Sequence, residues 1–235
     1  MRAGCPSPFA RFSASAIGTR ETPWSTTEPV DVEYSGMEPT PLPARGLAEA
    51  YLYVVVTPCP ACRRGFTRPC GGFDVQYQTT WSANLRVVCD DCGAEAAIAF
   101  TLGMEPAPFD VEDIRSVGNG ESPSRIIDVG QWLTLHSLFA AQSEAEHNAS
   151  RKRRLNLLAN LCVAEALLFY DDPGNDLPPS GALFTDASRE RFRSFPQYFS
   201  QARLRSLQER LPRATPSEAA PKRSPLSTPK PSEDA

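Results

Sequence analysis

Histidine and long apolar runs are the features that this sequence has least of. Its 235 residues include two histidines, His136 and His147, which would lie about 16 Å apart on one helix and could not bind a single metal ion. The longest apolar run, residues 51–56, is far shorter than the ~20 residues that a membrane-spanning helix needs. We therefore expect no histidine-based catalytic site and no membrane contact.

A strong excess of charge is also missing. The formal net charge is −4, so no global field draws the chain onto DNA, RNA or an anionic membrane. A Gly-rich phosphate loop and a convincing pair of catalytic carboxylates are absent from the sequence too. Any contact with nucleic acid must be local, and an enzyme of unknown class is the least supported of three possible roles.

Proline, in contrast, is abundant, with 23 residues, and it helps to divide the chain. Residues 1–46 and 212–235 are rich in proline and polar side chains, which predicts a disordered N-terminal extension and a disordered tail. An acidic Pro/Gly linker is predicted over 104–127. Two folded regions remain, 47–103 and 128–211, and we expect them to pack together, because a unit of about fifty residues buries little apolar area alone.

The first folded region is predicted to be a small, mostly antiparallel β unit. Residues 51–56 are β-branched and aromatic, which predicts a strand. Residues 73–81 alternate between apolar and polar side chains, which predicts a second strand, with a turn at 82–84. The pattern over 96–102 predicts the last strand.

The second folded region is predicted to be helical. Asp128 is a candidate N-cap for a helix with Trp132, Leu135 and Phe139 on one face. A second helix is expected from about Arg153 to Tyr170, giving a helical hairpin, and a third helical stretch over 188–211 should be interrupted near Pro196. The predicted fold class is therefore α+β.

Four cysteines carry the strongest chemical signal. Cys59 and Cys62 form one C-x-x-C turn, and Cys89 and Cys92 form another. Each turn delivers two thiolates, so two turns complete a tetrahedral shell for one metal ion. A glycine follows each pair, Gly65 and Gly93, and we expect a positive φ at both.

Residues 51–103 resemble the zinc-ribbon class, whose metal knuckles have the pattern C-P-x-C-x-x-G or C-x-x-C-G between strands. The resemblance implies one structural zinc ion on the four cysteines, in a closed shell without an open position for catalysis. Iron is the less favoured alternative, since rubredoxin-like sites use the same ligands. Cys70, in a glycine-rich turn between the pairs, could replace a ligand, although the two-pair solution does not need it.

The helical hairpin loosely resembles a single tetratricopeptide repeat. The residues that carry the resemblance have spacings common to helical hairpins in general; they are Trp132, Leu135, His136, Phe139, Ala159, Val163 and Ala166. Further repeats are not visible, so an ordinary hairpin with an apolar seam is the better interpretation.

We therefore expect a non-catalytic protein-interaction or scaffold module with a protein partner of unknown identity. The alternative is a nucleic-acid-binding accessory protein that uses Arg63, Arg64, Arg68 and the basic run Arg151–Arg154. Paired C-x-x-C turns without an apolar signal stretch before them favour metal ligands in a reducing compartment, so we expect a cytoplasmic location.

Overall fold

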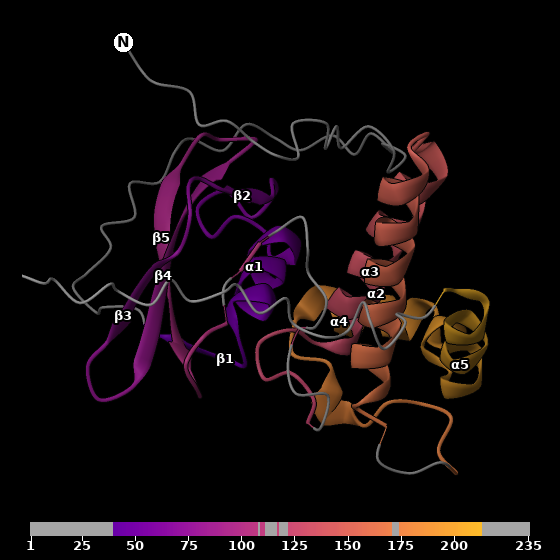
Figure 1. Ribbon diagram of the computed structural model, residues 1–235. Helices are drawn as coiled ribbons and strands as arrows, with labels where there is room; N and C mark the ends of the chain where they lie inside the picture. Colours follow the sequence, from indigo (N-terminus) through magenta and orange to yellow (C-terminus); the bar gives the residue numbers. More distant parts are fainter. Residues whose placement is uncertain (1–39, 108, 111–116, 118–121, 171–173, 213–235) are drawn as a thin grey trace, which may run out of the picture.

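The computed structural model describes residues 40–107, 109–110, 117, 122–170 and 174–212. Figure 1 shows a β-sheet on one side, a group of helices on the other, and helix α1 (Leu47–Val56) between them. The predicted α+β class is confirmed. Within the described residues, no helix combines the length and the apolar character that crossing a membrane requires.

A mixed five-stranded sheet forms the first layer. Its strands are β1 (Leu42–Ala44), β2 (Thr67–Pro69), β3 (Asp74–Tyr77), β4 (Trp81–Cys89) and β5 (Glu95–Leu102). The order is β1-β5-β4-β2, and β3 pairs with β4 next to β2. Strand β1 runs parallel to β5, whereas the other pairs are antiparallel. The long central strand β4 thus carries most of the pairing.

Strand β4 buries one face and leaves the other toward solvent. Ala83, Leu85 and Val87 are buried, while Arg86, which lies between them in the sequence, is exposed. Ala83 lies opposite the fully buried Phe100 of β5. This two-residue period is typical of a sheet covered on one side.

The prediction of a strand over residues 51–56 is wrong, because they belong to helix α1. Its buried residues lie on more than one side and include Tyr51, Leu52, Val54 and Val56, since the helix is enclosed by the sheet and the other helices. A short apolar run without alternation does not distinguish a buried strand from a buried helix. The packing of this segment therefore outweighed the β propensity of its residues, and the segment is helical.

The predicted hairpin turn is also shifted. The turn falls at residues 78–80, where the Gln78 N–H donates to the Thr80 carbonyl oxygen at 3.3 Å. Residues 82–84, predicted as the turn, lie inside β4. Because residues 83, 85 and 87 all point into the core, β4 must continue through this region.

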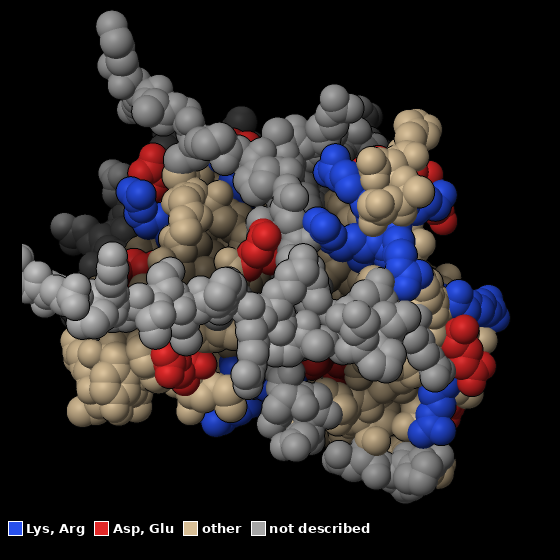
Figure 2. All heavy atoms as spheres, viewed as in Figure 1, with Lys and Arg blue, Asp and Glu red and all other residues tan. Residues whose placement is uncertain are grey.

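Helix α2 (Val129–Ala145) and helix α3 (Ala149–Leu167) form the predicted hairpin. Trp132, Leu135 and Phe139 are buried, which confirms the predicted apolar face. Exposed basic side chains from Arg151 to Arg154 lie in the first turns of α3, and Figure 2 shows Lys and Arg gathered over this part of the hairpin.

The third helical stretch is interrupted at Pro196, as predicted. Helix α4 (Asp186–Ser194) is followed by the short 3-10 helix η4 (Pro196–Phe199) and then by α5 (Gln201–Arg210). Another 3-10 turn, η3 (Ser180–Ala182), comes before α4. The ring of proline cannot continue the α-helical hydrogen bonding, so it begins a new element.

Asp128 caps α2, as predicted, and it also ties α2 to α4. One carboxylate oxygen accepts from the Gln131 N–H at 2.8 Å and from the Ser188 hydroxyl at 2.7 Å. The other oxygen accepts from the Thr185 N–H at 2.9 Å. A Cβ on Gly130 would lie 2.6 Å from the Ser188 Cβ, so the close contact between the two helices requires glycine there.

The sheet and the helices share one hydrophobic core, which confirms the expectation that they pack together. The range predicted as a linker contributes Val117, Ile126 and Ile127 to this core. Strand β1 lies within the range predicted as an extension, because its backbone completes the edge of the sheet beside β5. Residues 1–39 of the predicted extension and nearly all of the predicted tail lie outside the described residues.

Candidate metal centre

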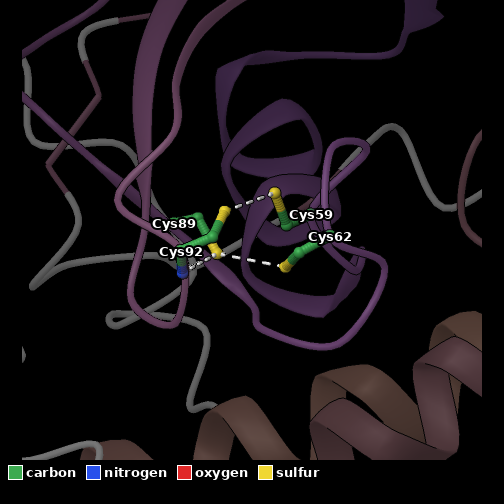
Figure 3. Close-up of side chains that lie close together, drawn as sticks. All are labelled: Cys59, Cys62, Cys89 and Cys92. Carbon is green, nitrogen blue, oxygen red and sulfur yellow. Dashed lines mark hydrogen bonds between the residues drawn. The ribbon is translucent and has the colours of Figure 1, made fainter. Parts of the chain in front are cut away.

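The structure brings the four predicted cysteines together. Cys59 and Cys62 lie in the loop between α1 and β2, Cys89 ends β4, and Cys92 lies in the turn before β5. Their four sulfur atoms lie within 4.8 Å of one another and point toward a common centre (Figure 3). Cys70 and the buried Cys162 are not members of this group.

The sulfur spacing fits a tetrahedral metal ion. The Sγ atoms of Cys59 and Cys92 are 3.9 Å apart, and those of Cys62 and Cys89 are 3.7 Å apart. A tetrahedron with metal–sulfur bonds of about 2.3 Å has sulfur–sulfur edges of about 3.8 Å. Two of the sulfur–sulfur distances, each joining one turn to the other, therefore match this edge, and all four sulfur atoms lie within 4.8 Å of one another.

The two turns repeat the same backbone arrangement. The N–H of Arg63 donates to the Cys59 carbonyl oxygen at 2.8 Å, and that of Gly93 donates to Cys89 at 3.1 Å. The Cys59 N–H then bonds to the Gly65 carbonyl oxygen at 2.8 Å, just as Cys89 bonds to the carbonyl of Ala94 at 2.9 Å. Two similar metal knuckles therefore face each other, and the first loop is one residue longer.

Backbone N–H groups point at the sulfur atoms. The Gly65 N–H donates to the Sγ of Cys62 at 3.4 Å, and the N–H groups of Asp91 and Cys92 donate to the Sγ of Cys89 at 3.4 and 3.5 Å. Such bonds stabilise thiolates and orient them for a metal ion. They are formed within the knuckles themselves, so local backbone geometry prepares the ligands.

The two glycines are needed for different reasons. Gly93 has φ +70°, as predicted. Gly65 is not among the residues with positive φ; instead, a Cβ there would lie 2.5 Å from the Asp91 Cβ and 2.8 Å from the Cys89 Sγ. Close approach of the second knuckle therefore requires glycine at 65, and the positive φ in the first knuckle falls on Arg63, at 55°.

Matched substitutions at Arg63 and Gly93 should change stability in opposite directions. Arg63→Gly should raise the free energy of unfolding of the metal-loaded protein by about 0.5–1 kcal/mol, since relief of the left-handed conformation outweighs the added backbone entropy. Gly93→Ala should lower it by a similar amount. Urea unfolding measures both effects, with Gly103→Ala as the control, because a Cβ on Gly103 meets no atom within 4 Å. Changes of the same sign at the two positions would contradict the paired geometry.

Hydrogen bonding and crowding shift two of the thiol pKa values in opposite directions. Backbone N–H groups of Gly65 and Arg64 lower the pKa of Cys62 to about 6. The pKa of Cys92 rises to about 11, since desolvation and the neighbouring thiols outweigh a backbone N–H from Ala94 that lowers it. Four sulfur atoms this close cannot all be thiolates unless a cation compensates their charge. A divalent ion supplies that compensation.

The arginines beside the first knuckle face the acids of the second. Arg68 Nε lies 2.7 Å from Asp90 Oδ1, and Arg64 Nε lies 3.6 Å from Asp91 Oδ2. At the hairpin end, Arg151 Nε lies 3.4 Å from a carboxylate oxygen of Glu146. Part of the positive charge predicted as a nucleic-acid contact is therefore compensated within the chain.

Sequence reasoning missed two features of the knuckles. The acids of the Cys89–Cys92 turn were not recognised as partners of Arg64 and Arg68, although opposite charges close to two paired C-x-x-C turns were a usable signal. The Thr67 hydroxyl donates to the Val54 carbonyl oxygen at 3.1 Å, which links the strand after the first knuckle to α1. No sequence pattern pointed to that bond, because α1 itself was predicted as a strand.

Comparison of the chain with protein-family models, with curated proteins and with solved structures gives no match.

Proposed function

We propose that this chain is a non-catalytic protein-interaction module whose fold is held by one structural zinc ion on Cys59, Cys62, Cys89 and Cys92. The observation that supports the metal site is the sulfur spacing, 3.7 and 3.9 Å across the two knuckles. Zinc bound by four thiolates has no open position for water, so it supplies stability and no Lewis-acid chemistry. Iron could use the same ligands, but zinc is the usual metal of four-thiolate ribbons.

The knuckles join parts of the chain that are distant in sequence. The first knuckle follows α1, which belongs to the core, and the second connects β4 to β5. A metal ion between them would fix α1 against the sheet. Because the thiolates must remain reduced to bind, this proposal agrees with a cytoplasmic location.

An interaction role is supported over nucleic-acid binding by the charge pattern. Arg64 and Arg68 lie against carboxylates, and a strand of phosphates would have to compete with these acids. Arg63 remains exposed in its turn, but one arginine beside the knuckles does not make a phosphate track. In the basic run 151–154, Arg151 pairs with Glu146. A closed metal shell and a helical hairpin present surfaces without a reacting centre, which fits protein contact.

Metal analysis tests the zinc proposal. Protein purified without chelator should contain about one zinc per chain, and cobalt exchanged into the site should show the absorption of tetrahedral cobalt thiolate. Cys162→Ala is the control, because this buried thiol lies outside the cluster and its loss should leave the metal content unchanged. Purified protein without any bound metal would overturn the proposal, and bound iron would correct the identity of the ion.

A further inference from the structure

Two aromatic rings project outward where α4 meets α5. Phe195 and Tyr198 are 49% and 40% exposed, and their ring centroids lie 5.8 Å apart. Phe192 and Phe199 of the same segment instead pack together at 5.3 Å, with Phe199 fully buried. The inward pair thus supplies the local core, and the outward pair adds apolar surface that the fold itself does not use.

Two arginines lie beside the outward rings. The guanidinium carbon of Arg203 lies 4.4 Å from the Tyr198 ring centre, and Arg203 Nη1 donates to the Tyr198 carbonyl oxygen at 3.1 Å. Arg191 Nη1 donates to the Thr134 hydroxyl at 3.1 Å. The Arg203 guanidinium is therefore held over the Tyr198 ring, and the Arg191 guanidinium is held against α2, on the residue one helical turn before Phe195. We call Arg191, Phe195, Tyr198 and Arg203 the aromatic–arginine surface.

The charges of these two arginines are not compensated within the part of the chain that the structure describes. Neither Arg191 nor Arg203 has a carboxylate within salt-bridge distance there, whereas Arg189 and Arg193 of α4 pair with Asp186 and Glu190. Burial and the nearby charge of Arg203 lower the pKa of Arg191. Arg191 is half-buried and Arg203 is exposed, and two like charges that act on each other form a site that an anion would stabilise.

We propose that the aromatic–arginine surface docks an acidic segment of a partner protein, with an apolar side chain on Phe195 and Tyr198 and a carboxylate that accepts from Arg203 and Arg191. This inference rests on the proposed interaction function and assigns that function a location and a partner chemistry. Exposed aromatic rings beside arginine are the composition typical of protein interfaces and their hot spots.

A peptide fits this surface better than a nucleic acid does. Single-stranded nucleic acid presents one phosphate per nucleotide along its whole length and needs a continuous basic track. Here Arg191 and Arg203 are the two arginines of the surface, and the adjoining helix alternates arginines with exposed Asp186 and Glu190, so it offers no continuous basic track. A short acidic segment needs only one or two cationic partners.

Fluorescence anisotropy of the zinc-loaded, full-length chain tests the inference. The probe is a labelled twelve-residue peptide of Glu-Asp-Phe repeats, with labelled oligo(dT) and polyglutamate as comparisons. We expect saturable binding of the Glu-Asp-Phe peptide that is weakened at least about tenfold by Arg203→Gln and by Tyr198→Ala. Tyr198→Phe keeps the ring and should bind as the unsubstituted chain does. Arg205→Gln, an exposed arginine of the same helix, is the control and should change the dissociation constant less than about twofold.

The inference would be overturned if the Glu-Asp-Phe peptide showed no saturable binding, or if Arg205→Gln weakened peptide binding as much as Arg203→Gln. Tighter binding of oligo(dT) that depends on the same residues would overturn it as well. Equal binding of polyglutamate would also overturn it, because the rings would then contribute nothing. Zinc content and circular dichroism of every variant keep the two proposals apart. If the unsubstituted chain contains zinc but does not bind the peptide, only the inference about this surface is contradicted. If the unsubstituted chain contains no zinc, the proposed function is contradicted.

Discussion

Cys89→Ser should remove the bound metal and unfold both knuckles. Cys89 is the most constrained of the four ligands: it is 2% exposed, and its sulfur accepts from two backbone N–H groups while lying 3.7 Å from Cys62. Structural zinc binds with about 10–16 kcal/mol in small zinc-finger peptides, which is comparable with the entire stability of a domain, about 5–15 kcal/mol. Under the proposed zinc site, losing a ligand therefore removes much of the free energy that holds the two knuckles together.

Amide exchange locates this effect. In Cys89→Ser, or after zinc is removed by a chelator, protection should disappear from β2, from the end of β4 and from the start of β5, the segments that flank the knuckles. Cys162→Ala should keep the zinc and the protection of these strands, at the cost of a small core cavity in α3. Unchanged exchange and an unchanged thermal midpoint in Cys89→Ser would show that the cluster does not hold a structural metal.

Local signals predicted the cysteine cluster and the cap of α2. Two cysteines at a three-residue spacing can lie in only a few turn conformations, so the motif carries its own geometry. Asp128 was recognised for a similar reason, because an N-cap acts on residues immediately after it, and its bond to the Gln131 N–H is seen at 2.8 Å. Its bonds to Thr185 and Ser188 depend on how α4 packs and had no local signal.

Non-local packing decided the features that the sequence did not predict. Helix α1 is enclosed on more than one side, so its apolar run lacks the period that marks a helix. Arg63 adopts a positive φ because the first loop must close like the second. In the second knuckle, Gly93 follows Cys92 directly, whereas Gly65 comes three residues after Cys62, so Arg63 occupies the position that Gly93 has. A positive φ was predicted for both glycines from residue type alone, and the structure has it only at Gly93.

A buried charge cluster near the start of α1 likewise had no sequence signal. Arg45 Nε donates to Glu49 Oε1 at 2.8 Å, Arg45 Nη2 donates to Glu165 Oε2 at 2.6 Å, and Arg45 Nη1 donates to the Ser122 carbonyl oxygen at 2.7 Å. The Glu49 side chain is fully buried, and that of Glu165 is 5% exposed. A single guanidinium therefore compensates two buried carboxylates and links α1 to α3.

Arg45→Met should lower the free energy of unfolding by about 3–5 kcal/mol at pH 7, because two buried carboxylates lose the one cation that pairs with them among the described residues. Burial raises the pKa of Glu165, Arg45 opposes this shift, and Glu49 adds to it. A raised carboxyl pKa stabilises the folded state below the ordinary glutamate value of about 4.3 and loses that effect as the pH rises through the folded value. Without Arg45 the folded pKa of Glu165 rises further, so the stability lost to the substitution should shrink as the pH falls.

Urea unfolding of Arg45→Met between pH 7 and pH 5 measures this dependence, and Glu165→Gln added to Arg45→Met should recover part of the loss, because it removes one buried charge. Arg189→Met is the matched control. Its ion pair with Asp186 is as short, 2.7 Å, but Asp186 is fully exposed, and a pair of that kind contributes at most about 1 kcal/mol. If Arg45→Met lowers the free energy of unfolding no more than Arg189→Met does, and if its effect does not depend on pH, then Arg45 does not compensate the two buried carboxylates. A large loss confined to Arg45→Met, and reduced by Glu165→Gln, would show that the start of α1 is fixed to α3 through a single buried guanidinium.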